Sequence, residues 1–320
     1  MDGPRFFAAI AISALCAAAA AQTRLVAERP LQGPVFRGGV DLVHMGVTVT
    51  DRRGNLITDL KEDDFEIREN GQMQTIRYFS MGEPASASPE LHLGVLLDVS
   101  GSMAEDIGFT RTAAIRFLNS LLDAVDITLV DFDTEVRVAR YGQRDFARLV
   151  ERIRQQKLGV YTAMYDAIGV YLDGADGQDG RKIMVLYTDG GDTRSTLRFS
   201  EVVDLLKASD VTVYSIGALD HQPGAVRNAQ RMILQQIADA TGGEAYFPTS
   251  VKELDKIYEH VVAEIRAQYA VGYVSTNDKT DGAWRRVDIR VTRPDVKDLK
   301  IRSRKGYFAP YRDRTRPPGR

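Results

Sequence analysis

The segment LLDVSGSMAED, from Leu96 to Asp106, places one carboxylate and two hydroxyl groups at the end of an apolar run. Asp98, Ser100 and Ser102 occupy alternate positions, so in an extended turn their side chains lie on one side of the backbone. Three oxygen atoms can then converge on one point above the end of a strand. Oxygen-only ligand sets are the ones that hard cations such as Mg²⁺, Mn²⁺ and Ca²⁺ prefer.

Two later segments place similar polar groups beside predicted elements. GVYTAMYDAI supplies Thr162 at the start of a predicted helix, and KIMVLYTDGGD supplies Asp189 after an apolar run. Ligands of parallel α/β sheets bind beyond the carboxyl ends of the strands, where the strand order reverses. The sequence therefore predicts a site for Mg²⁺, or for Mn²⁺ or Ca²⁺, made by Asp98, Ser100, Ser102, Thr162 and Asp189. The set contains no imidazole or thiolate, which disfavours zinc.

A purely structural interpretation of the first segment is also open. Ser102 and Glu105 have the spacing of a capping box, in which the serine caps a helix and the glutamate reaches back to it. Asp98 could equally lie near a helix N-terminus and interact with its dipole. In that case the oxygen atoms would stabilise a helix end instead of binding an ion.

The elements around these residues predict an α/β domain over residues 91–268. Apolar runs of strand length alternate with amphipathic stretches, which is typical of a doubly wound, mostly parallel sheet with helices on both faces. The segment VRVARY predicts an antiparallel edge strand. The predicted strands are LHLGVLLDVS, ITLVDFD, KIMVLYTDG and VTVYSIGAL, and the predicted helices lie near residues 105–124, 144–155, 162–172, 200–209, 230–240 and 251–268.

The segments on either side of this domain are β-like. Residues 22–80 contain alternating runs around Asn70-Gly71, a strong hairpin signal, and residues 269–311 contain further short strands. The composition of residues 80–90 is that of a linker. Because each flank is too small to bury a core alone, we expect residues 38–80 and 269–311 to pair into one β-sandwich.

The N-terminus and the overall composition indicate an exported protein. Residues 1–21 combine a basic start, an alanine-rich apolar core and small residues, which predicts a secretory signal peptide and a secreted or periplasmic protein. Cys16, the single cysteine, lies inside that peptide, and no later run predicts a transmembrane span. The net charge of −2 does not favour nucleic acid as a partner. A basic tail is expected at residues 312–320.

DVSGSM, followed by a later Thr and by TDG after an apolar strand, resembles the von Willebrand factor type A domain and its metal-ion-dependent adhesion site. The flanking segments, including RSRKGYF, are similar to an exported VWFA-related family that is abundant in Acidobacteria. The resemblance implies that Ser100, Ser102 and Thr162 contact the metal directly. It also implies that Asp98 and Asp189 act directly or through water, and that an Asp or Glu of a protein partner completes the shell.

This resemblance favours a non-enzymatic protein-binding module, and two alternatives stay open. In an envelope scaffold the metal would only stiffen the top of the sheet. A metal-assisted hydrolase would need a base beside the ion, for which Asp133 and Asp192 are the residues to consider. Family members usually carry small residues where Val160 and Tyr161 precede Thr162, so Tyr161 either covers the metal or contacts the ligand. In related modules the last helix, here near residues 251–268, slides to change metal affinity.

Two weaker patterns have simpler explanations. Asp173, Asp176 and Asp179 recur at every third position, whereas a calcium-binding EF-hand loop needs carboxylates at alternate positions, so a solvated turn is expected. The basic residues 302–305 could contact anionic lipid or polysaccharide, but a solvated segment is the simpler expectation.

Overall fold

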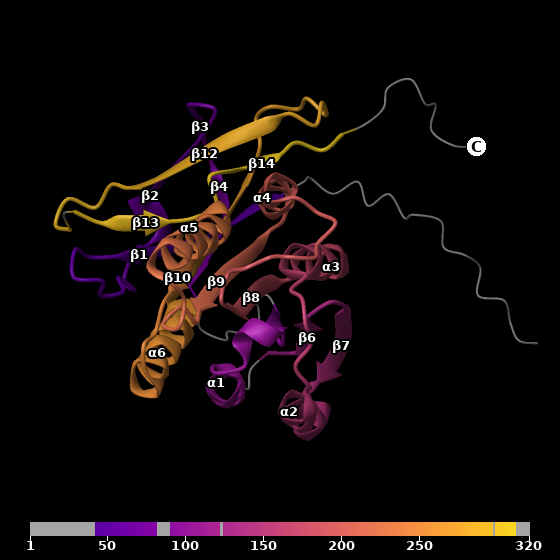
Figure 1. Ribbon diagram of the computed structural model, residues 1–320. Coiled ribbons are helices and arrows are strands. Elements are labelled where there is room, and N and C mark those ends of the chain that lie inside the picture. Colours follow the sequence, from indigo (N-terminus) through magenta and orange to yellow (C-terminus); the bar gives the residue numbers. More distant parts are fainter. Residues whose placement is uncertain (1–41, 82–89, 122–123, 297, 312–320) are drawn as a thin grey trace, which may run out of the picture. The chain divides into compact units, whose positions relative to one another are not determined.

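A six-stranded sheet lies at the centre of the computed structural model (Figure 1). Its strand order is β10-β9-β8-β5-β6-β7, and every neighbouring pair is parallel except β6 and β7. The predicted mostly parallel sheet and its antiparallel edge strand are therefore confirmed. The strands are β5 (Leu91–Asp98), β6 (Asp126–Phe132), β7 (Val136–Gly142), β8 (Arg181–Thr188), β9 (Val211–Gly217) and β10 (Glu244–Tyr246).

The structure describes residues 42–81, 90–121, 124–296 and 298–311, which belong to one unit spanning Val40–Arg320. The predicted signal peptide at 1–21, residues 82–89 of the predicted linker and the predicted basic tail at 312–320 lie outside these ranges. No helix within the described ranges has an apolar stretch long enough to cross a bilayer.

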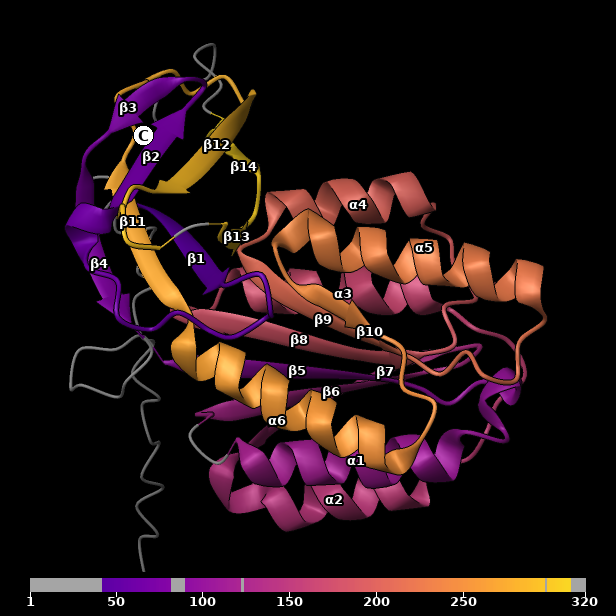
Figure 2. The same ribbon diagram turned by 90° about the vertical axis from the view of Figure 1, so that its left-hand side faces the viewer.

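Helices cover both faces of the central sheet (Figure 2). One face carries α1, α2 and α6, and the other carries α3, α4 and α5. All eight residues of β5 are buried, as expected for a strand covered on both sides. The helices are α1 (Ile107–Ser120), α2 (Phe146–Gln155), α3 (Met164–Asp176), α4 (Phe199–Ala208), α5 (Gly224–Thr241) and α6 (Val251–Ala267), with 3₁₀ turns η1 (Glu62–Asp64), η2 (Gly101–Met103) and η3 (Gln143–Asp145).

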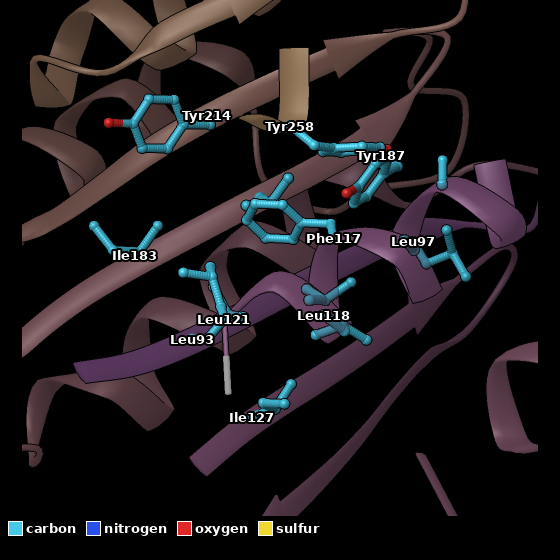
Figure 3. Close-up of a cluster of buried hydrophobic side chains, with 14 of the residues drawn as sticks. Leu93, Leu97, Phe117, Leu118, Leu121, Ile127, Ile183, Tyr187, Tyr214 and Tyr258 are labelled. Atoms are coloured by element: carbon cyan, nitrogen blue, oxygen red, sulfur yellow. The ribbon is translucent and has the colours of Figure 1, made fainter. Parts of the chain in front are cut away.

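Aromatic packing attaches α6 to the sheet on the first of these faces (Figure 3). The Tyr258 ring of α6 lies 5.3 Å from the Phe117 ring of α1 and 6.3 Å from the Tyr187 ring of β8, centroid to centroid. All three side chains are almost fully buried. Burial of a large apolar side chain contributes about 1.5–3 kcal/mol, so this aromatic contact stabilises the position of α6 together with Leu254, Val261 and Ile265 of the same core.

Two antiparallel four-stranded sheets form the second part of the fold, and each combines strands from both ends of the chain. Their apolar side chains share one core, so the β-sandwich expected in the fold class is confirmed. The first sheet has the order β13-β1-β11-β4 and the second β14-β12-β2-β3. The strands are β1 (Leu42–Thr50), β2 (Phe65–Glu69), β3 (Gln72–Gln74), β4 (Ile76–Met81), β11 (Tyr269–Val274), β12 (Trp284–Val291), β13 (Lys300–Arg302) and β14 (Gly306–Phe308).

The hairpin between β2 and β3 follows directly from its sequence. Asn70 and Gly71 both have positive φ angles, 48° and 86°, which a two-residue type I′ turn requires. Asparagine and glycine are the residues that adopt this conformation at the lowest cost. The turn also fixes the register in which β2 pairs with β3.

The basic residues at 302–305 connect the sandwich to the α/β part of the same unit. The Arg302 guanidinium pairs with the buried carboxylate of Glu264 in α6, and Arg304 donates to the carbonyl oxygen of Ser209, which follows α4. The expectation that this segment is solvated is therefore wrong for Arg302 and Arg304. Their partners are distant in sequence, so local composition could not reveal them.

Removal of the last three strands is expected to unfold β2 and β3 without unfolding the central sheet. A chain ending at Gly282 lacks β12, so β2 keeps only its hairpin partner, and an isolated hairpin is at best marginally stable. Hydrogen exchange measured by mass spectrometry should show loss of protection in Phe65–Glu69 and retention in Leu91–Asp98. Full protection of β2 in the shortened chain would contradict this prediction.

Candidate metal centre

The candidate site lies at the carboxyl ends of two neighbouring strands, β5 and β8. Asp98 is the last residue of β5, and Asp189 follows the last residue of β8. From β5 the chain continues to β6 and β7 on one side and later to β8 and β9 on the other. The strand order therefore reverses between β5 and β8, which is where ligands bind in open α/β sheets.

Asp98 is fully buried, and each of its carboxylate oxygens has a fixed partner. Oδ1 accepts the backbone N–H of Ser100 at 2.9 Å, and Oδ2 accepts the hydroxyl of Thr188 at 2.6 Å. The Thr188 oxygen in turn accepts the N–H of Gly190 at 3.0 Å. Thr188 thus connects the first predicted ligand to the loop that carries the last one.

Asp189 is held in a similar way by two groups outside the predicted set. Its Oδ1 accepts the N–H of Gly191 at 2.9 Å, and its Oδ2 accepts Nε2 of Gln222 at 3.1 Å. Sequence reasoning missed both Thr188 and Gln222. The position of Thr188 could have indicated its role, because it directly precedes Asp189 at the end of the strand. Gln222 lies in the loop after β9, and no sequence motif surrounds it.

The two serines lie together, and the capping-box interpretation is wrong. Ser100 and Ser102 place their hydroxyl oxygens 3.0 Å apart. Ser102 lies inside the 3₁₀ turn η2, helix α1 begins only after Asp106, and neither of their N-caps has a side-chain cap. Glu105 instead lies 3.3 Å from Nε2 of His221. The Ser102 side chain is therefore exposed and free to face a ligand.

Thr162 joins the other residues through the backbone of its loop. Its N–H donates to the hydroxyl of Thr193 at 3.0 Å, and its carbonyl accepts the N–H of Thr193 at 2.9 Å, in the loop after Asp189. On the other side, the N–H of Gly159 donates to the carbonyl of Val99 at 2.8 Å. The loops that carry all five predicted ligands are thus connected to one another. One residue, Ala163, separates Thr162 from the start of α3, and Thr162 is almost fully buried.

The electrostatics of the site favour a cation. Asp98 and Asp189 are both buried, and among the described residues no Lys or Arg forms an ion pair with either carboxylate. Burial, with a smaller contribution from the charge of Asp189, raises the pKa of Asp98 to about 7. Buried carboxylates are ordinarily paired with a positive charge. Two carboxylates and neutral hydroxyls fit Mg²⁺ or a similar hard cation.

The two residues considered as bases for a hydrolase both have structural partners. Asp133 accepts Nη1 of Arg137 at 3.1 Å. Asp192 accepts the N–H of Tyr165, in the first turn of α3, at 3.0 Å and the hydroxyl of Ser195 at 2.6 Å. The hydrogen bonds of Asp192 fix the loop after Asp189 against the start of α3, and the pair with Arg137 gives Asp133 a structural role as well.

A second acidic group lies away from this site, around the start of β10 and the end of α6. Within the described residues, Glu244, His260 and Glu264 form the one group of at least three Asp, Glu, His or Cys residues whose potential ligand atoms lie within 4.8 Å of one another. The Arg302 guanidinium already pairs with both glutamates, at 3.1 Å from Glu244. His260 lies 3.0 Å from Glu264, and this hydrogen bond raises the pKa of His260. Arg302 therefore supplies the positive charge that a metal ion would bring.

The Asp173, Asp176 and Asp179 segment forms no carboxylate cluster. Asp173 and Asp176 lie within α3, which extends further than predicted, and the carbonyl of Asp179 lies 2.8 Å from Nε2 of His92. The predicted solvated turn is thus shorter than expected, because the helix continues to Asp176.

Comparison with protein families decides the identity of the domain. The family model described as von Willebrand factor type A domain matches residues 92–260, more than half of the chain. The chain belongs to this family. The match covers the central sheet and its helices as far as the middle of α6, so the predicted resemblance to VWA domains is confirmed.

Solved structures with a similar fold include other bacterial VWA proteins. A VWA protein from Catenulispora acidiphila is 14% identical, with a TM-score of 0.47, over 88% of this chain and 76% of that one. The vWF domain of the type V pili tip protein Mfa5 from Porphyromonas gingivalis is 14% identical, with a TM-score of 0.46, over 61% of this chain and 99% of that domain. A mutant PilB minor pilin from Streptococcus sanguinis is 14% identical, with a TM-score of 0.46, over 58% of this chain and 63% of the pilin chain.

At such low identities the likeness concerns the fold alone. The chain matches less than two thirds of the minor pilin. The comparison with curated proteins found no match.

Proposed function

We propose that this VWA protein is an extracytoplasmic protein-binding module that recognises an acidic side chain of its partner through a divalent cation. In this proposal the cation is Mg²⁺, or Mn²⁺ or Ca²⁺, and the partner contributes an Asp or a Glu. The burial of Asp98 and Asp189 at the point where the strand order reverses, with no basic partner in the part of the chain that the structure describes, carries the proposal. The residues that would hold the cation are Asp98, Ser100, Ser102, Thr162 and Asp189.

The bound cation would supply the positive charge that attracts the partner's carboxylate. The chain's own residues keep the ligand oxygens in place beforehand: Thr188 and the Ser100 N–H orient Asp98, and Gln222 orients Asp189. Such supporting hydrogen bonds typically change metal affinity by about 10–100-fold. The uncharged serine hydroxyls leave the cation electrophilic enough to accept a further carboxylate.

The location in this proposal rests on the N-terminal segment. The predicted signal peptide at 1–21 directs the chain out of the cytoplasm, and the mature protein then acts in the periplasm or outside the cell. A cysteine-free mature chain requires no disulfide there, because the central sheet and the sandwich each have a core of their own.

Chelation of divalent cations is expected to abolish partner binding. The chain without its predicted signal peptide should take up Mg²⁺ in titration calorimetry. It should also retain a partner from envelope extract in Mg²⁺ and release it in excess EDTA, because the partner's carboxylate would then meet only the negative charges of Asp98 and Asp189. Undiminished retention in EDTA would contradict recognition through the cation.

The same experiment distinguishes the two alternatives. An envelope scaffold with a purely structural metal would keep its partner when the site is emptied and would lose only thermal stability. A metal-assisted hydrolase would turn over an activated ester or phosphate in Mg²⁺. Sliding of α6 stays a prediction, and its contacts with Phe117, Tyr187 and Arg302 are the ones that such a movement would have to change.

A further inference from the structure

The loop that carries Thr162 exposes two large apolar side chains next to the candidate metal centre. The exposed fraction is 74% for Val160 and 53% for Tyr161, and these residues directly precede the buried Thr162. Exposed apolar residues that are scattered singly are common on protein surfaces, whereas contiguous exposed apolar surface is a feature of interaction sites. We call Val160 and Tyr161 together the apolar lip.

The backbone of this loop is fixed on every side. Before the lip, the Gly159 N–H donates to the Val99 carbonyl at 2.8 Å, and Arg111 donates to the Gln156 carbonyl. After the lip, the Ala163 N–H donates to the Asp133 carbonyl at 2.8 Å. The lip is thus the exposed tip of an anchored loop.

Gly159 shows how closely the loop approaches its neighbours. A Cβ atom at Gly159 would lie 2.2 Å from Oδ2 of Asp133, so only glycine allows this contact. Asp133 in turn is paired with Arg137 and directly follows the last residue of β6, Phe132. A surface held in this way loses little backbone entropy when a partner covers it, which favours binding.

The position of the lip determines the kind of ligand it fits. Consecutive Cα atoms are about 3.8 Å apart, so Tyr161 lies one such step along the chain from Thr162 and Val160 lies two steps from it, and neighbouring residues of a bound peptide are separated by the same step. A partner whose carboxylate occupies the metal site therefore places the residue next to that carboxylate against the lip. An apolar side chain there would bury apolar surface on both molecules.

We propose that Val160 and Tyr161 select protein partners in which the metal-binding Asp or Glu has a large apolar residue directly beside it in a surface loop. This inference rests on the proposed function, since it assumes that an acidic residue occupies the metal site. In this inference the cation requires that the partner supply a carboxylate, and the lip distinguishes one acidic partner from another.

Three capped dipeptides test this inference: N-acetyl-Asp-Phe-amide, N-acetyl-Phe-Asp-amide and, as the reference, N-acetyl-Asp-Gly-amide. Affinities for the chain without its predicted signal peptide are measured by NMR titration in saturating Mg²⁺. At least one phenylalanine peptide is expected to bind about tenfold more tightly than the glycine peptide, the ratio that burial of roughly 60 Å² of apolar surface supplies.

The double variant Val160→Ser/Tyr161→Ser should reduce this preference to within about twofold and leave Mg²⁺ affinity unchanged. Val138→Ser is the matched control, because Val138 is a similarly exposed apolar residue, at 48%, on the edge strand β7. The control should keep the full preference. Both variants change exposed side chains, so the fold is expected to survive.

The outcomes separate this inference from the proposed function. Equal, Mg²⁺-dependent binding of all three peptides would overturn the role of the lip and leave recognition of a carboxylate intact. A preference for phenylalanine that survives in the double variant would also overturn it, because another surface would then make the selection. Binding of none of the peptides by the Mg²⁺-loaded protein would overturn both.

Discussion

Replacement of Asp98 by Asn is expected to abolish Mg²⁺ uptake and to leave the metal-free fold at least as stable as that of the parent chain. Asn keeps the size of the side chain but removes the charge that a hard cation requires, so affinity should fall by at least about 100-fold. Its amide oxygen can accept the Ser100 N–H, and its amide N–H can donate to the Thr188 oxygen. Burial of a hydrogen-bonded amide costs less than burial of an unpaired carboxylate.

Calorimetry and thermal unfolding together check this prediction. At a Mg²⁺ concentration of about 100 times the dissociation constant, the parent chain should gain about 2.7 kcal/mol over its stability in EDTA. Asp98→Asn should gain nothing. Asp173→Asn makes the same chemical change at an exposed position of α3 and should behave like the parent chain. A variant at Asp98 that is still stabilised by Mg²⁺ would show that the cation binds elsewhere.

Replacement of Glu69 by Ala is expected to lower the free energy of unfolding by about 3–5 kcal/mol, because it leaves a buried charge and several hydroxyls without their partner. Only 2% of Glu69 is exposed, at the end of β2. Its Oε1 accepts hydrogen bonds from the Ser275 hydroxyl at 2.8 Å and from the Arg285 guanidinium at 3.3 Å. Its Oε2 accepts hydrogen bonds from the hydroxyls of Tyr273 at 2.9 Å and Tyr307 at 2.8 Å. This one carboxylate therefore connects an N-terminal strand to the C-terminal strands of both sheets.

Urea unfolding of matched variants measures this effect. Glu66→Ala, in the same strand, removes a carboxylate that forms an ion pair with the nearby Arg68, and should cost no more than about 1 kcal/mol. The double variant Glu69→Met/Arg285→Met should recover much of the loss, since it removes both buried charges and fills their space. A cost for Glu69→Ala no larger than that for Glu66→Ala would show that the buried pair does not hold the sandwich together.

The sequence alone determined the features that local chemistry specifies. The alternation of apolar strands and amphipathic helices predicted the central sheet, and Asn70-Gly71 predicted the β2–β3 hairpin, because strand burial and a positive φ angle each restrict the residue types within a short segment. Asp98, Ser100 and Asp189 were recognisable for a related reason. Polar residues at the end of an apolar strand have few roles other than a site or a helix cap.

The tertiary structure decided which long-range partner each polar group meets. Ser102 had the spacing of a helix cap, yet the first turn after β5 is 3₁₀ and its hydroxyl lies beside that of Ser100. Gln222 holds Asp189, and Arg302 pairs with Glu264, across separations that no sequence motif records. The reason is physical: local propensity acts over a few residues, whereas the energy of a buried charge depends on the groups that the whole fold brings within hydrogen-bonding distance.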